Sequence, residues 1–235
     1  MDTQARIDRL LQKLHRNGRD TPTLILYAEG VKTKLRQARF SLKILRDLVH
    51  LEDEYSGQSG ATGPTTLTGL DSLTVSEQVN YYCDCFWDFL RSSLDILGQL
   101  INELHSLGIG ERDVDFKTVV SKMESVAPGS PLEKALDALR NHSRAFKQLE
   151  NYRHCSTHRR HIYIETKTVT EAVTGSPGYY AGTSASRSVT ERYLCTNPWD
   201  VKPRVNGGKR PVVQYCELLL KQIEENIDKI VYHLL

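Results

Sequence analysis

The sequence has no apolar run long enough to cross a membrane and no paired cysteine motif. A membrane-spanning helix needs about 20 consecutive apolar residues, and the 235-residue chain contains no such stretch. Its first residues, Met1 to Asp8, have no signal-peptide apolar core. The five cysteines are odd in number and include no C-x-x-C pair, which argues against a disulfide framework and a thiolate zinc site. We therefore expect a cytoplasmic protein without a membrane segment.

An excess of charge of one sign is also missing from the chain as a whole. The formal net charge is +2, which does not by itself indicate a nucleic-acid-binding protein. The charge is nevertheless uneven, because residues 151–210 carry 10 Lys and Arg against 4 Asp and Glu, whereas residues 1–150 carry 19 against 21. This basic segment can attract phosphate locally, although a solvated basic loop has the same composition.

Four long segments repeat apolar residues at intervals of three and four, which is the spacing of a buried helix face. They are residues 21–54, 74–108, 131–149 and 211–234. Shorter helical patterns occupy residues 4–17 and 116–126. Short connections between long amphipathic helices favour antiparallel neighbours. We therefore predict an all-α fold, an up-and-down bundle of four principal helices with a short N-terminal helix.

Two segments do not follow the helical pattern. Residues 55–75 are rich in Gly, Ser and Thr and are interpreted as a flexible connector. Residues 161–170 and 189–194 are rich in β-branched side chains and alternate with a period of two, and they predict a small β-hairpin between the third and fourth long helices. With the basic loop around it, this insertion covers 161–210. The pattern shows no second core, so residues 1–235 are expected to form a single domain.

The densest group of chemically active side chains follows the third long helix, at residues 151–161. These eleven residues contain three arginines, three histidines, a thiol and no acid. Arg153 lies four residues after Leu149 and continues the apolar stripe, so its guanidinium needs a carboxylate or a phosphate as partner. His158 would lie about 140° from Arg153 on a continuous helix. The two converge on one substrate only if the helix ends or kinks, or if a second copy completes the site.

Arg153-His154-Cys155-Ser156-Thr157-His158 resembles the R-x4-6-H motif of the HEPN superfamily, in which a polar residue follows the arginine. The four-helix pattern and the position of the motif at a helix end strengthen this resemblance. It implies an all-helical protein that binds RNA, forms a homodimer with a composite site, and acts as a metal-independent endoribonuclease of a defence or toxin–antitoxin system. An antitoxin or another defence-system protein is then an expected partner.

The resemblance also implies roles for individual residues. Arg153 would bind the scissile phosphate, and His158 would transfer the proton, as the two catalytic residues. The remaining expected substrate contacts are His154, which would orient the arginine or the substrate, the phosphate-binding Arg159 and Arg160, and Tyr152, which would stack on a base.

Two other interpretations remain open from the residues alone. The first is a non-catalytic helical module that uses the same basic segment to bind a nucleotide or a protein. The second is a zinc site formed by Cys155 with His154, His158 and His161. The adjacent arginines and the lack of a carboxylate argue against binding a dication there, so we expect no metal and no cofactor.

Overall fold

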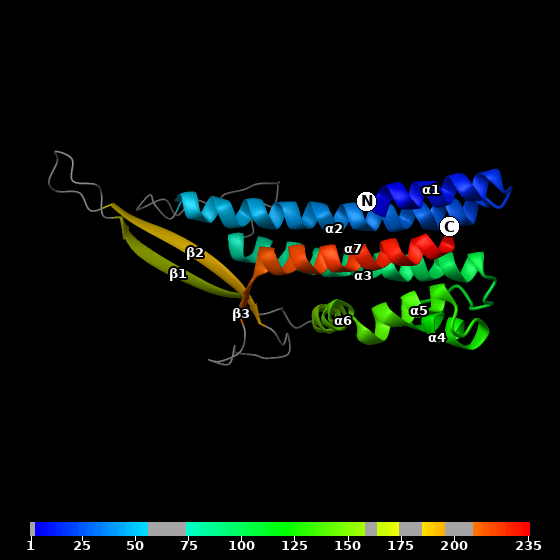
Figure 1. Ribbon diagram of the computed structural model, residues 1–235. Coiled ribbons are helices and arrows are strands. Elements are labelled where there is room, and N and C mark those ends of the chain that lie inside the picture. Colours follow the sequence, from blue (N-terminus) through cyan, green and yellow to red (C-terminus); the bar gives the residue numbers. More distant parts are fainter. Residues whose placement is uncertain (1–2, 56–73, 158–163, 174–184, 196–208) are drawn as a thin grey trace.

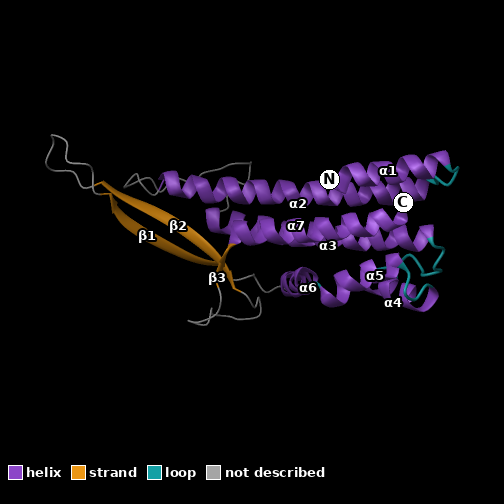
Figure 2. Ribbon diagram, viewed as in Figure 1, coloured by secondary structure: helices purple, strands orange, loops and turns teal. Residues whose placement is uncertain are grey.

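The computed structural model describes residues 3–55, 74–157, 164–173, 185–195 and 209–235. Within these residues the protein is mostly helical, as Figures 1 and 2 show. The predicted connector at 55–75 lies outside the described residues apart from its ends, and so does much of the predicted insertion at 161–210.

Three long helices form the centre of the molecule. They are α2 (Pro22–Tyr55), α3 (Val75–Leu104) and α7 (Val212–Leu234). α2 runs antiparallel to α3 and α7, and the three pack lengthwise (Figure 1). α1 (Thr3–Arg16) packs on α2 and α7, and α4 (Phe116–Val126) packs on α3. These five helices confirm the corresponding sequence predictions.

Local sequence signals explain where these helices begin. Thr74 and Glu77 form a capping box at the start of α3, in which each side chain accepts a hydrogen bond from the backbone N–H of the other residue. Asp115 caps α4 by accepting the Thr118 N–H at 2.7 Å. These caps satisfy backbone donors that the first helical turn leaves without partners.

The predicted third long helix is wrong as a continuous element. The chain instead forms α5 (Pro131–Asp137), a π-helical turn at Ala138–His142 and α6 (Arg144–Thr157). Ser143 between them is extended, with φ −78° and ψ 120°, and its hydroxyl accepts the Phe146 N–H. The serine therefore starts a new helix. Apolar periodicity missed this break because the stripe from Leu132 to Leu149 stays buried on both sides of it.

Between α6 and α7 the described residues form a small antiparallel sheet. β1 (Ile164–Val173) pairs with β2 (Ala185–Cys195), with Val169 opposite Val189. A third strand, β3 (Lys209–Pro211), pairs with the end of β2 and leads directly into α7. β1 and β2 extend past the end of α2 in Figure 2.

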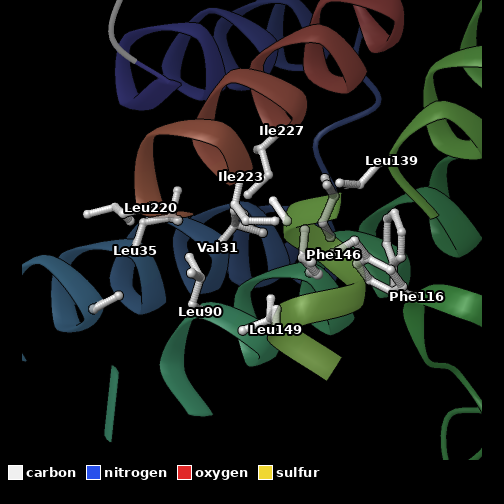
Figure 3. Packing of buried hydrophobic residues seen from close by; sticks show 14 of the residues in the cluster. Val31, Leu35, Leu90, Phe116, Leu139, Phe146, Leu149, Leu220, Ile223 and Ile227 are labelled. Atoms are coloured by element: carbon white, nitrogen blue, oxygen red, sulfur yellow. The ribbon is translucent and has the colours of Figure 1, made fainter. Parts of the chain in front are cut away.

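The core lies between α2, α3 and α7 and extends to α4 and α6. Figure 3 shows Val31 and Leu35 of α2 with Leu90 of α3 and Ile223 of α7, next to Phe146 of α6. The aromatic side chains of Phe86 and Trp87 on α3 are completely buried. This packing fixes α6 against α3, which is the contact that positions the candidate site.

Candidate functional site

Arg153 lies near the C-terminal end of α6, on the side of that helix that meets α3. Its guanidinium interacts electrostatically with two carboxylates of α3, Asp88 and Asp95. These residues are seven positions apart, which places them on one face of the helix. Another helix of the same chain therefore places two carboxylates within the range of the Arg153 charge.

Both carboxylates have raised pKa values, and the main cause is desolvation. Partial burial raises the pKa of Asp88, while Arg153 and Lys34 act in the opposite direction. Burial also raises the pKa of Asp95, against the lowering effects of Arg91, of the Phe116 N–H and of Arg153. Asp95 is the more buried of the two, and the positive charge of Arg153 favours the ionised form of both carboxylates.

Arg91 connects α3 to α6 beside this arginine. Its side chain is 3% exposed and forms ion pairs with Asp95 of its own helix and with Glu150 of α6. Lys117 of α4 also pairs with Glu150. The Asp95 carboxylate accepts the Phe116 N–H at 3.1 Å, which joins α4 to the same network. These four side chains therefore anchor the helix that carries Arg153.

This network was not among the predictions from the sequence, although the sequence contains a signal for it. Arg91 is the single Lys or Arg among residues 51–100, and it lies beside Leu90 between the buried Trp87 and Leu94. A lone arginine on an apolar helix face requires a buried partner. Asp88 and Asp95, three residues before and four after it, complete a charged strip along that face.

Tyr152 does not lie where the sequence analysis expected it. Its side chain is 1% exposed and stacks on Trp87, with ring centroids 4.5 Å apart and an interplanar angle of 9°. A ring packed in this way has no face open to a nucleic-acid base. The expected base-stacking role is therefore corrected to a packing role, which holds α6 against α3.

The remaining predicted site residues are placed only in part. His154 is exposed in the last turns of α6. His158, Arg159 and Arg160 lie outside the described residues, as do His161 of the alternative zinc site and the side chain of Cys155. The convergence of Arg153 with His158 stays a prediction. Among the described residues no group of three His, Cys, Asp or Glu side chains is arranged to hold a metal ion.

Comparison with known protein families gives a match to HEPN_Cthe2314-like HEPN over residues 66–191, more than half of the chain. The chain belongs to this HEPN family. The matched part of this HEPN protein contains α3, α4 and α6, together with both residues of the R-x4-H sequence. No curated protein and no solved structure matches the chain. None of the helices in the described residues has a stretch long and apolar enough to cross a bilayer.

Proposed function

We propose that this HEPN protein binds RNA and cleaves it without a metal ion, with Arg153 and His158 acting at the same phosphodiester. The family match over the helices that carry Arg153 is the observation that supports this proposal. The packing of α6 on α3 adds support, because the Arg91 network and the Tyr152 stack hold the last turns of α6 in place. A catalytic arginine requires such a rigid support.

The proposed chemistry is an attack of the 2′-hydroxyl on the adjacent phosphorus. His158 takes the 2′-hydroxyl proton as general base, or gives a proton to the departing 5′-oxygen, since an unperturbed imidazole titrates near pH 6.5. Arg153 stabilises the negative charge on the phosphoryl oxygens of the pentacoordinate transition state. The bond to the 5′-oxygen breaks, which leaves a cyclic phosphate on one fragment and a 5′-hydroxyl on the other.

The surrounding residues have supporting roles in this proposal. Arg159 and Arg160 bind flanking phosphates without sequence preference, and His154, which is exposed beside Arg153, orients the substrate. A homodimer brings two copies of the site together. The proposed setting is a cytoplasmic defence or toxin-type system in which a partner protein restrains the cleavage.

A non-catalytic binding module is the second candidate function, and the surroundings of Arg153 favour it. Asp88 and Asp95 already offset the positive charge of Arg153. A purely structural arginine has the same surroundings. In that case RNA or a protein binds the basic segment at residues 151–210, and no RNA is cleaved.

Cleavage of a labelled single-stranded RNA in the presence of EDTA separates the two functions. We expect cleavage by the full chain to be lost in His158→Ala and in Arg153→Ala. It should persist in the control variants His142→Ala and Arg144→Ala, whose side chains are exposed and lie before the motif. Circular dichroism and light scattering should show the same helix content and mass for all variants. Binding without cleavage by the wild-type chain would favour the non-catalytic module.

A further inference from the structure

A groove of about 630 Å³ lies between α2 and α3. Its walls include Phe40 from α2 and Tyr81 and Phe89 from α3. Tyr81, Cys85 and Phe89 are spaced by four residues, so the wall that α3 contributes is one row of side chains along that helix. Its volume lies within the roughly 300–1,000 Å³ typical of small-molecule sites.

Half of the residues that line the groove are aromatic, and two of these aromatic side chains are exposed to solvent. Phe40 is 57% exposed and Tyr81 is 51% exposed. Phe89 is partly buried against the core and has the Lys34 ammonium 4.9 Å from its ring centroid. Large exposed aromatic side chains that gather at one place mark a binding surface more often than isolated ones do. The flat rings of these three residues suit a flat apolar ligand.

The charge of the groove is positive. Among the described residues that line it, the charged one is Arg36, whose Nη2 donates a hydrogen bond to the Thr33 hydroxyl at 3.2 Å. No described carboxylate lies within ion-pair distance of Arg36. A guanidinium at the edge of an apolar groove is a natural partner for an anionic group.

The other ionisable groups of the groove do not cancel this charge. The Tyr81 phenol is hydrogen-bonded to the Cys85 thiol, and this contact raises the pKa of Tyr81. Burial raises the pKa of Cys85, so both groups are neutral at pH 7. Asp84 and Asp88 lie close to Cys85 but outside the groove lining. Of these, Asp88 interacts electrostatically with Arg153 and with Lys34.

We propose that this groove is a binding site for a small aromatic anion, with the ring system against Phe40, Tyr81 and Phe89 and the negative group beside Arg36. Among the described residues, those that line the groove belong to α2 and α3, whereas the proposed RNA site is built on α6. The proposal therefore concerns a second ligand.

Two fluorescent probes with the same ring skeleton test this proposal on the full chain. 1-Anilinonaphthalene-8-sulfonate carries a sulfonate, and N-phenyl-1-naphthylamine is its uncharged counterpart. We expect saturable binding of both probes, with the anion bound more tightly. Arg36→Gln should weaken binding of the sulfonate probe about tenfold, the loss of one charge-assisted hydrogen bond, and leave the neutral probe within about twofold. Phe40→Ala should weaken both probes.

The control variant is Arg112→Gln, which removes an exposed arginine from the loop between α3 and α4. It should leave both titrations unchanged. The proposal is wrong if Arg36→Gln and Arg112→Gln bind the sulfonate probe equally well. It is also wrong if light scattering shows a dimer that excludes the probe and that Phe40→Ala dissociates, because the groove is then an interface between two copies. RNA cleavage is not measured in these titrations, so their outcome is independent of the proposed nuclease.

Discussion

The Tyr152 ring on α6 stacks on the Trp87 indole of α3, with the ring centroids 4.5 Å apart. Tyr215 of α7 meets both rings, at 5.9 Å from Tyr152 and 6.2 Å from Trp87. The three rings form one aromatic cluster that joins α3, α6 and α7. The α6 member of this cluster, Tyr152, directly precedes Arg153 in the sequence. The stack fixes Tyr152 of α6 against α3, and it therefore also positions the neighbouring Arg153 relative to that helix.

Truncating the stacked ring tests this packing role. We expect Tyr152→Ala to lower the free energy of unfolding by about 3–5 kcal/mol, because it leaves a cavity beside Trp87. Tyr152→Phe keeps the ring and should cost about 1 kcal/mol. Urea unfolding followed by tryptophan fluorescence measures both changes. An alanine variant with wild-type stability and weaker RNA binding would instead support the base-stacking role.

The buried Arg91 ion pairs should contribute far more to stability than the exposed pair in the same network. Arg91→Ala leaves Glu150 and Asp95 without their buried partner and should cost about 3–5 kcal/mol. Lys117→Ala removes a side chain that is 46% exposed, and it should cost at most about 1 kcal/mol. Chemical denaturation of the two variants gives the comparison. Equal losses would show that Arg91 is not the centre of the network.

The helix cap at Asp115 provides a matched pair of substitutions. Asp115→Ala should destabilise the protein by about 1 kcal/mol, because the Thr118 N–H loses its acceptor. Asp113→Ala removes an exposed aspartate two residues earlier and should change stability by less than about 0.5 kcal/mol. Thermal unfolding at pH 7 measures both variants.

The contribution of this cap should depend on pH. Burial pushes the pKa of Asp115 upward, but the hydrogen bonds from Thr118 outweigh it and the pKa is lowered below the ordinary 3.8. The folded state therefore favours the charged form, so the stabilisation is present above pH 3.8 and is lost as the pH falls below that value. Unfolding curves of wild type and Asp115→Ala should converge in acid. A difference that grows in acid would contradict the assignment.

Removing the Asp88 carboxylate should strengthen RNA binding if the proposed function is right. Asp88→Asn removes a negative charge beside Arg153, and we expect roughly fivefold tighter binding at fixed ionic strength. Fluorescence anisotropy with a labelled RNA measures it, with Asp113→Asn as control. Weaker binding by Asp88→Asn would show that the carboxylate is needed to orient the arginine.

The Asp88→Asn substitution should also affect the stability of the protein. Burial raises the pKa of Asp88, so its contribution to stability decreases as the pH rises above the ordinary value of 3.8. At pH 7 the asparagine variant should therefore be as stable as the wild type or more stable. A clear loss of stability would mean that the Asp88 contacts with Lys34 and Arg153 outweigh the cost of burial.

The amino-acid sequence was sufficient for most helix positions. The predicted ranges begin within one residue of the starts of α3 and α7, and they match both ends of α4. These features depend on interactions within a few residues, so the sequence contains the information directly. The position of Arg153 on the apolar side of its helix could be predicted for the same reason.

The sequence by itself determined which faces are buried and that Arg153 requires a counter-charge. Only the tertiary structure decided that Asp88 and Asp95 lie within range of its charge, that Ser143 interrupts the third helix, and that Tyr152 stacks on Trp87. The physical reason is that helical periodicity records whether a side chain points inward. The identity of the group it meets depends on how helices distant in the chain pack together.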